Sequence, residues 1–268
     1  MRIGALVPVR LASERLPAKA LADVVGRPAI HHLLDRLFAV PSLAPDRVVV
    51  CTTEDATDDP LVPVVEAAGA RVYRGSRDDL VDRLYHATHA FGFDAVIEAD
   101  GDDPCVDAAY ADLALRRLLT ADAPDVVTVD GLPLGLATKA IRASAIERVW
   151  ERHVPGRNDT GFMYYFTRAG LCSHASVEPL SDAHRHPTAR LTLDYPEDLA
   201  FFRALFGELH QDGAPFGVAE IVALLRRRPD LLTINAGLDE RYWARTRALV
   251  AEARLAYRVG DRTVEVEA

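Results

Sequence analysis

The residue types best suited to phosphate chemistry gather in one short segment near the N-terminus. Arg10, Ser13, Arg15 and Lys19 fall within ten residues, directly after the apolar run at 3–9. A polyphosphate needs dispersed positive charge and directional donors, which Arg supplies as a rigid fork and Lys as a mobile point charge. The segment has neither the GxxxxGK(S/T) nor the GxGxxG pattern, so it is not a P-loop or a dinucleotide fingerprint. Spacing alone leaves a solvated basic loop as an equal alternative.

Carboxylates gather at two further places. Asp100, Asp102 and Asp103 follow an apolar run that ends at residue 98. Mg²⁺ favours one or two carboxylates together with phosphate oxygens and water, although an acidic turn is the alternative because Asp and Gly also form turns for backbone reasons. Asp194 precedes Pro196, where a helix is expected to start, so it has an ordinary explanation as a helix cap.

The elements that must position these residues alternate between short apolar runs and longer amphipathic stretches. Strands are predicted at residues 3–9, 47–52, 70–73, 94–98 and 125–129. Helices are predicted at residues 28–38, 59–69, 78–91 and 107–120. This alternation predicts an α/β fold with a mostly parallel twisted sheet and helices on both faces. Ligands of such sheets bind beyond the carboxyl ends of the strands, so the site is expected after the first, second and fourth strands.

The second half of the chain is less regular. Strands are predicted at 134–141 and 189–193, with a short hairpin around Gly260. Further helices are predicted at residues 142–152, 196–209, 218–228 and 239–256. The segment 154–181 mixes polar, aromatic and Gly residues, and we interpret it as part of an insertion.

Composition bounds the class of protein. The 268 residues include 31 Lys and Arg against 40 Asp and Glu, a net charge of −9, which disfavours general nucleic-acid binding. Three widely spaced cysteines make a disulfide framework or a structural zinc site improbable. The apolar start breaks at Pro8 and Arg10, too early for a signal peptide or a membrane span. We therefore expect a cytoplasmic protein without nucleic-acid or membrane partners.

The basic loop resembles the N-terminal signature of the CMP-sugar-acid synthetases, in which a hydrophobic strand leads into (A/V)-R-x-x-S-x-R-L-P-x-K. This group includes the 3-deoxy-manno-octulosonate, acylneuraminate and spore-coat-polysaccharide cytidylyltransferases, and this chain is most similar to the last type. In the family the loop wraps the triphosphate, so the resemblance implies that Arg10, Ser13, Arg15 and Lys19 bind it. Val9 stands where the family usually has Ala.

The acidic segments are similar to two other elements of the family. Gly101-Asp102-Asp103-Pro104 matches G-D-x-P, and residues 190–199 match R-x-T-(V/L)-D-x-P-E-D-L. The resemblance implies that Asp102 and Asp194 bind Mg²⁺ across a cleft. Asp100 departs from the spore-coat type, which usually has Thr there, and it creates a D-x-D sequence typical of glycosyltransferases.

The resemblance also indicates where the nucleotide binds. It places the nucleobase at Thr52 and Thr53, and the segment 74–85 is close to R-G-S-x-x-D-V-L-D-R-Y, which borders the nucleotide in the spore-coat type. The residues of this segment that we expect at the nucleotide are Arg74, Gly75, Asp79 and Arg83. An ion pair between Asp79 and Arg83, four residues apart on a helix, is an equally good explanation of those two.

Two other groups of residues have weaker explanations. Arg185 and Arg190 are candidates for binding the carboxylate of an acid substrate. The spacing of His174, His184 and His186 matches no metal site, so they are interpreted as surface residues.

Together these matches imply, by resemblance, a Mg²⁺-dependent nucleotidyltransferase of the Rossmann-like nucleotide-diphospho-sugar transferase fold. It would transfer CMP from CTP to a 2-keto-3-deoxy octulosonate or nonulosonate and release pyrophosphate, with Arg10, Arg15, Lys19 and Asp102 as the catalytic group. We expect a domain at 1–237 with a substrate or dimerisation insertion at about 130–190, a C-terminal helix and hairpin at 238–268, and a homodimer. The alternatives are a D-x-D glycosyltransferase using a nucleotide-sugar donor and a non-enzymatic nucleotide-binding module.

Overall fold

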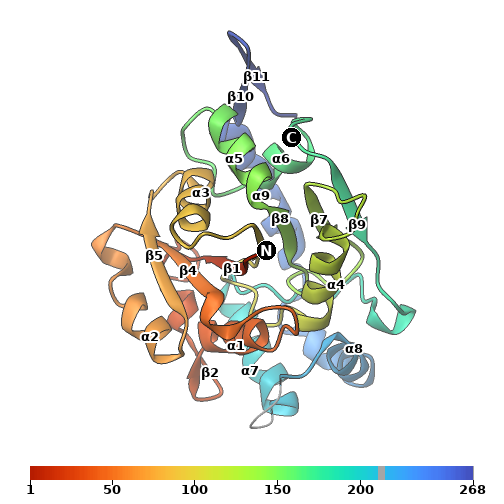
Figure 1. The fold of residues 1–268 in the computed structure, drawn as a ribbon. Coiled ribbons are helices and arrows are strands. Elements are labelled where there is room, and N and C mark those ends of the chain that lie inside the picture. The colour runs from red at the N-terminus through yellow and green to blue at the C-terminus, as the bar shows by residue number, and fades with distance from the viewer. Residues whose placement is uncertain (211–214, 268) are drawn as a thin grey trace.

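A seven-stranded mixed sheet forms the centre of the computed structural model, which describes residues 1–210 and 215–267 (Figure 1). The strand order is β5-β4-β1-β6-β8-β7-β9, and β8 alone runs against its neighbours in this sheet. The strands are β1 (Ile3–Pro8), β4 (Val48–Thr53), β5 (Arg71–Gly75), β6 (Ala95–Glu98), β7 (Val126–Val129), β8 (Lys139–Arg142) and β9 (His174–Val177). The predicted α/β fold with a mostly parallel sheet is confirmed.

Helices cover both faces of the sheet because its central strands are apolar on both sides. Ala5 and Val7 of β1 belong to one buried cluster, and Leu6 between them belongs to the other, as the alternation of side chains along a strand requires. The first face is covered by α1 (Ala29–Phe38), α2 (Leu61–Ala67), α4 (Ala108–Leu118), α7 (Pro196–Leu209) and α8 (Val218–Arg227). The second is covered by α3 (Leu80–Ala90), α5 (Ala143–Arg152), α6 (Met163–Thr167) and α9 (Leu238–Ala253). No helix in the described part of the chain is long and apolar enough to cross a bilayer.

The register of the central strands brings three polar loops to one edge of the sheet. In β1, Pro8 pairs with Cys51 of β4, and Leu6 pairs with Glu98 of β6. Because these strands are parallel, the segments that follow them leave the sheet on the same side. The expectation that the loops after the first, second and fourth strands meet at this edge is therefore confirmed.

Two strands expected in the second half differ from the structure. The strand expected at 134–141 begins only at Lys139, because Gly135 adopts φ +90° in a turn, where an added Cβ would lie 2.2 Å from the Leu191 carbonyl oxygen. The strand expected at 189–193 is wrong. That segment instead crosses the edge of the sheet, where the Leu191 amide donates to the Leu134 carbonyl at 2.8 Å and the Leu193 amide to the Asp102 carbonyl at 2.8 Å.

The C-terminal elements follow the prediction more closely. Helix α9 is followed by an antiparallel hairpin of β10 (Ala256–Val259) and β11 (Arg262–Glu265), which turns at Gly260 and projects beyond α5 (Figure 1). A short hairpin of β2 (Asp23–Val24) and β3 (Arg27–Pro28) was not expected from the sequence. The proposed insertion contributes α6 and the edge strand β9 to the body of the fold.

Candidate active site

The basic loop after β1 is held in place by one buried carboxylate. Asp58 accepts hydrogen bonds from the Leu11 amide at 2.7 Å and from the Thr53 amide at 3.2 Å, so it joins the loop to the end of β4. The Ala18 amide donates to the Leu11 carbonyl at 3.0 Å, and Ala18 itself adopts φ +55°. The loop, residues 9–19, therefore folds back on itself and presents its polar side chains from a fixed frame. We call it the phosphate loop, after the ligand that the resemblance predicts for it.

The acidic loop after β6 lies directly against the phosphate loop because of Gly101. Its amide donates to the Pro8 carbonyl at 3.2 Å, and an added Cβ would lie 2.1 Å from Val9 Cγ2 and 2.7 Å from the Pro8 oxygen. Contacts this short are not tolerated, so the close approach requires glycine. The glycine of the G-D-x-P element thus has a steric role, which is to bring Asp102 beside the phosphate loop.

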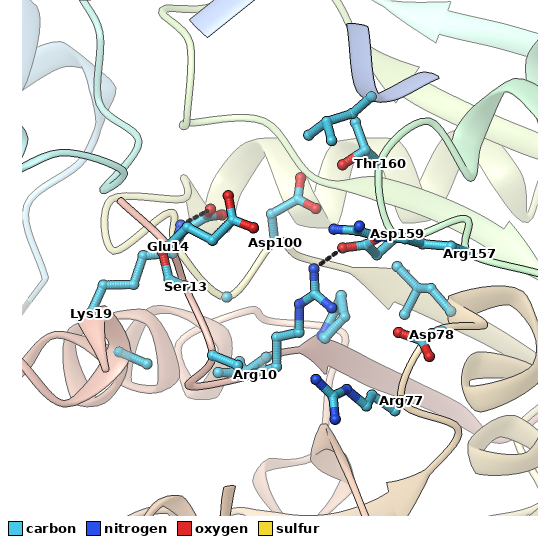
Figure 2. Close-up of a pocket in the computed structure, with 18 of the residues that line it drawn as sticks. Arg10, Ser13, Glu14, Lys19, Arg77, Asp78, Asp100, Arg157, Asp159 and Thr160 are labelled. Atoms are coloured by element: carbon cyan, nitrogen blue, oxygen red, sulfur yellow. Dashed lines mark hydrogen bonds and ion pairs between the residues drawn. The ribbon is translucent and has the colours of Figure 1, made fainter. Parts of the chain in front are cut away.

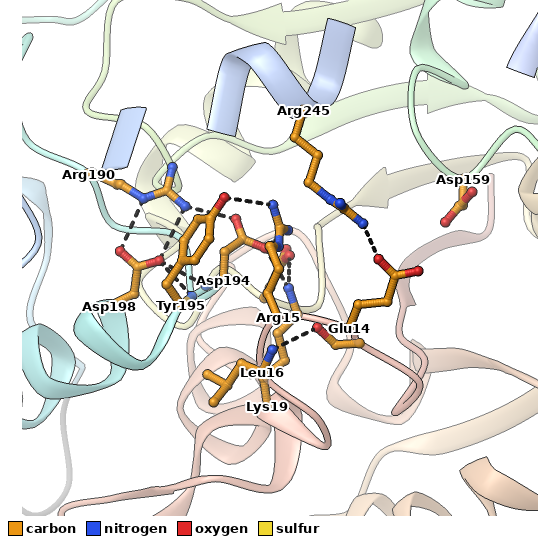
Figure 3. Close-up of polar contacts among 12 residues, drawn as sticks. Glu14, Arg15, Leu16, Lys19, Asp159, Arg190, Asp194, Tyr195, Asp198 and Arg245 are labelled. Carbon is orange, nitrogen blue, oxygen red and sulfur yellow. Dashed lines mark hydrogen bonds and ion pairs between the residues drawn. The ribbon is translucent and has the colours of Figure 1, made fainter. Parts of the chain in front are cut away.

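Asp102 and Asp194, although far apart in the sequence, meet at Lys19. The Lys19 ammonium lies 2.6 Å from Asp102 Oδ2 and 2.8 Å from Asp194 Oδ1, and Arg15 also pairs with Asp194 (Figure 3). Burial would lower the pKa of Lys19, but the two carboxylates outweigh it and raise that pKa. Burial likewise would raise the pKa of Asp194, but Lys19 and Arg15 hold it below its usual value. The position between the two carboxylates is therefore one that attracts a cation.

Asp194 is oriented by Arg190, which is almost fully buried. The Arg190 guanidinium donates to Asp194 Oδ2 at 2.9 Å and to Asp198 at 3.1 and 3.2 Å. Asp198 also accepts from the Asp194 and Tyr195 amides, both at 3.0 Å, so Asp198 and not Asp194 caps the start of α7. Asn235 also donates to Asp198, at 3.0 Å. Arg190 thus positions a site carboxylate instead of lining the pocket.

A pocket of about 480 Å³ opens above these loops (Figure 2). All four predicted residues of the phosphate loop line it, as do Asp100, Asp102 and Arg83. Arg83 is buried, its Nε has no hydrogen-bond partner, and burial lowers its pKa. The pocket therefore gathers the cations that the sequence placed at a triphosphate.

Four of the cations around the pocket each pair with a carboxylate. Figure 2 shows Arg10 and Asp159 pointing toward each other across the opening. The other pairs are Arg15 with Asp194, Lys19 with Asp102, and Arg245 with Glu14. An anionic ligand must therefore compete with these carboxylates for the cations of the phosphate loop.

The other residues expected at the nucleotide lie beside or behind this pocket. Thr52 and Thr53 are buried at the end of β4, and Thr52 Oγ1 has no hydrogen-bond partner. Arg74 donates to the Thr53 carbonyl at 2.9 Å and pairs with Asp59 at 2.7 Å. Like Gly75, which follows it at the end of β5, Arg74 is not part of the pocket lining.

Asp79 has a structural role in the fold. It caps α3 by accepting from the Asp82 amide at 3.0 Å, and it also accepts from Asn158 at 2.7 Å and contacts His153 at 2.9 Å. These contacts occupy its carboxylate, and no ion pair joins it to Arg83 among the described side chains. Asp79 thus lies outside the pocket lining, whereas Arg83 is part of it.

Sequence reasoning missed the partner of Asp100. Lys139 of β8 pairs with Asp100 and lies 2.9 Å from Glu98 Oε2, and strand register places Glu98 opposite Lys139. Glu98 is 0% exposed, and burial together with the charge of Asp100 raises its pKa to about 8. The available signal was Glu98, the one charged residue of the otherwise apolar strand β6. Because Lys139 occupies Asp100, the D-x-D sequence does not present two free carboxylates.

Among the described residues, no group of three or more His, Cys, Asp and Glu side chains is arranged to hold a metal ion. His184 contacts the Tyr110 hydroxyl at 2.8 Å, and His174 contacts the Thr128 hydroxyl at 3.0 Å. The oxygen donors of Asp102 and Asp194 nevertheless suit Mg²⁺, which takes few protein carboxylates and fills its shell with phosphate and water.

Comparison with known proteins agrees with this geometry. Residues 4–214 match the cytidylyltransferase family, and the chain belongs to it. It is 28% identical to a 3-deoxy-manno-octulosonate cytidylyltransferase of Aeromonas salmonicida over 85% of this chain and 86% of that protein. It is 26% identical to the spore coat polysaccharide biosynthesis protein SpsF of Bacillus subtilis over 85% and 95% of the two chains.

The fold is similar to a solved cytidylyltransferase of Leptospira borgpetersenii, with a TM-score of 0.76 and 21% identity over 87% of this chain and 97% of that one. The chain is thus an enzyme of the nucleotidyltransferase class with a Rossmann-like fold. Family membership favours this class over the D-x-D glycosyltransferase and over the non-enzymatic binding module.

Proposed function

We propose that this cytidylyltransferase transfers CMP from CTP to a 2-keto-3-deoxy sugar acid and releases pyrophosphate, in a reaction that depends on Mg²⁺. The observation that carries the proposal is the convergence of Lys19 with Asp102 and Asp194 beside a loop that also holds Arg10 and Arg15. A triphosphate needs several cations, and a divalent ion bound to it needs carboxylates within reach.

The proposed reaction is an in-line displacement at the α-phosphorus. The acceptor hydroxyl oxygen forms a bond to the α-phosphorus, its proton is released, and the bond to the oxygen that bridges to the β-phosphorus breaks. Arg10, Arg15 and Lys19 bind the β- and γ-phosphates and stabilise the negative charge that pyrophosphate carries away. No covalent intermediate with the protein is needed, so positioning and charge supply the catalysis.

Asp102 and Asp194 are the residues that would hold Mg²⁺, which when bound neutralises phosphate charge and orients the reacting groups. Lys19 Nζ bridges the two carboxylates, so their oxygens suit a cation. When CTP and the ion enter, Lys19 is expected to turn from the carboxylates to the phosphates.

The nucleotide is proposed to extend from the phosphate loop toward Arg83 and the end of β4. The unpaired Arg83 Nε supplies hydrogen-bonding capacity at that end, whereas Thr52 is 0% exposed and lies outside the pocket lining. Thr53, Arg74 and Gly75 lie outside the pocket lining, and Arg74 donates to the Thr53 carbonyl at the end of β4. The assignment of cytosine and of a sugar acid follows from the names of the family and of its relatives, which is also why polysaccharide biosynthesis is the proposed context. A cytoplasmic location and a homodimer stay predictions.

A pyrophosphate-release screen tests this function. Each of the four nucleoside triphosphates is supplied with Mg²⁺ and with 3-deoxy-manno-octulosonate, with N-acetylneuraminate, or with neutral sugars of similar size. We expect release with CTP and a sugar acid, and little with ATP or GTP. Release that needs a purine triphosphate, or that is supported equally by neutral sugars, would contradict the proposal.

A further inference from the structure

The C-terminal helix α9 forms one wall of the active-site pocket. It lies beyond residues 4–214, the part of the chain that matches the family, yet Arg245 and Leu249 line the pocket together with the phosphate loop. Tyr242, Arg245 and Leu249 are spaced by three and four residues, so they share one face of the helix. That face is turned toward the site.

Both ends of α9 are anchored, which fixes the position of its middle. At the first turn, Asp239 lies 3.5 Å from Arg190, and the Arg190 guanidinium stacks 4.6 Å from the centre of the Tyr242 ring. At the far end, Val250 is buried, and Gly161 (φ +88°) approaches it so closely that an added Cβ would lie 2.8 Å from Val250 Cγ2. The helix is therefore held between Arg190, which orients Asp194, and the segment that carries Asp159.

Arg245 reaches from this helix to the carboxylate of Glu14 (Figure 3). Glu14 is the one acidic residue of the phosphate loop, and its side chain is 72% exposed, against 37% for Arg245. An ion pair this exposed is weak, so another carboxylate can displace Glu14 at little cost. Arg10, Arg15 and Lys19 already supply cations to the triphosphate from the floor of the pocket, whereas Arg245 comes from the opposite wall.

We propose that Arg245 binds the carboxylate of the acid acceptor, and that Glu14 occupies this guanidinium until the acceptor enters. Thr160 and Leu249 line the pocket nearby and add a hydroxyl and an apolar surface, which suit a sugar acid with hydroxyl and methylene groups. Arginine is well matched to this role because its planar fork binds a carboxylate through two hydrogen bonds. The assignment rests on the proposed function and names the residue that selects an acid over a neutral sugar.

Steady-state kinetics of Arg245→Ala, with Arg247→Ala as the matched control, test the assignment. Arg247 is an exposed residue of the same helix and is not part of the pocket lining, so its replacement removes the same charge. With CTP and 3-deoxy-manno-octulosonate or N-acetylneuraminate, Arg245→Ala is expected to raise the KM for the acid about 10- to 100-fold. The KM for CTP should stay within about twofold, and Arg245→Lys should restore part of the loss.

The methyl ester of the acid gives a second readout. If Arg245 binds the carboxylate, the wild type should bind the methyl ester more weakly than the acid. Arg245→Ala should bind the acid and the ester with similar affinity. Equal KM values for the acid in Arg245→Ala and Arg247→Ala would overturn the assignment, as would a rise confined to the KM for CTP. If the wild type releases no pyrophosphate from CTP with either acid, the proposed function fails, and this assignment fails with it.

Discussion

Lys19 is the residue at which the charges of the site converge. It holds Asp102 and Asp194 together, and by the proposed function it binds the phosphates when CTP is present. Arg15 shares Asp194 and so has the same double role. The charge balance of the pocket therefore depends on Lys19 and Arg15, which by this account exchange carboxylate partners for phosphates when CTP binds.

Replacing either Lys19 or Arg15 should weaken binding of the triphosphate and slow its reaction. Lys19→Ala and Arg15→Ala each remove a charged contact to phosphate, which is worth about 1.5–3 kcal/mol and lowers kcat/KM for CTP by roughly one to two decades. Circular dichroism should show the native fold in both variants, because neither residue is part of the hydrophobic core. Values of kcat/KM within twofold of the wild type for both variants would contradict the assignment.

The two carboxylates are expected to act as a unit through one ion. Asp102→Asn and Asp194→Asn should each reduce activity by roughly two decades or more and raise the Mg²⁺ concentration needed for half-maximal rate. Their losses should be non-additive in the double variant. Asp100→Asn is the comparison, since Lys139 already occupies Asp100 and the proposed ion does not use it. An unchanged Mg²⁺ requirement in Asp102→Asn would be incompatible with this role.

The resemblance to family motifs, and not residue spacing alone, predicted the phosphate loop and the two carboxylates, because each belongs to a short contiguous motif. Arg245 and Asp159 could not be predicted in the same way. Their partners, Glu14 and Arg10, lie 231 and 149 positions away, and only the packing of distant elements brings them together. Asp79 is the opposite case. It belongs to a motif that resembles the family, but its contacts in the structure are those of a residue that caps α3 and pairs with His153.

At the scale of elements, the approach of the loops after β1 and β6 decides whether the site can form. The added Cβ of Gly101→Ala should push Val9 and the Pro8 carbonyl away from the acidic loop. We expect this to destabilise the protein by about 1–3 kcal/mol, with loss of activity. Gly207→Ala is the matched control, because a Cβ at this exposed position of α7 meets nothing within 4 Å. Alanine there should be neutral or stabilising. Urea unfolding measures both, and equal stability of the two variants would argue against the packing described.

The contact between the end of α5 and the start of α3 should make stability depend on pH. Burial would lower the pKa of His153, but Asp79 outweighs it and raises that pKa above the usual 6.5. A raised histidine pKa stabilises the fold below the unfolded pKa, and this contribution is lost as the pH rises through the folded pKa. His153→Asn should therefore lower the melting temperature more at pH 6 than at pH 9. A larger loss of melting temperature at pH 9 than at pH 6 would contradict the pairing of His153 with Asp79.

The sheet shows where prediction of elements succeeds and where it stops. The parallel strands are buried apolar runs between helices, so their positions followed from local composition. The segment at 189–193 alternates apolar and polar residues as a strand does, but it packs across loops, because Gly135 allows Leu191 to approach the turn at 134. The antiparallel direction of β8 and the wall formed by α9 depend on contacts between distant parts of the chain, which the local pattern does not encode.

For the whole molecule, a net charge of −9 coexists with a pocket rich in cations, so binding should be selective for the ligand that those cations fit. CTP with Mg²⁺ should raise the melting temperature more than ATP or GTP at the same concentration, since a ligand at 100 times its Kd adds about 2.7 kcal/mol of stability. Lys19→Ala should reduce this shift. An equal or larger shift with a purine triphosphate would contradict the proposed cytosine site.

The central claim is that the bond between the α- and β-phosphates of CTP is broken and that CMP is joined to a sugar acid. The most direct test follows the two ends of the nucleotide in parallel reactions with α-³²P-CTP or γ-³²P-CTP, Mg²⁺ and the sugar acid, with Asp102→Asn as the blank. The account predicts that the α label appears in a CMP-sugar and the γ label in pyrophosphate, in equal amounts. Label that stays in CTP, or a γ label released as inorganic phosphate while the α label remains in CDP, would contradict it.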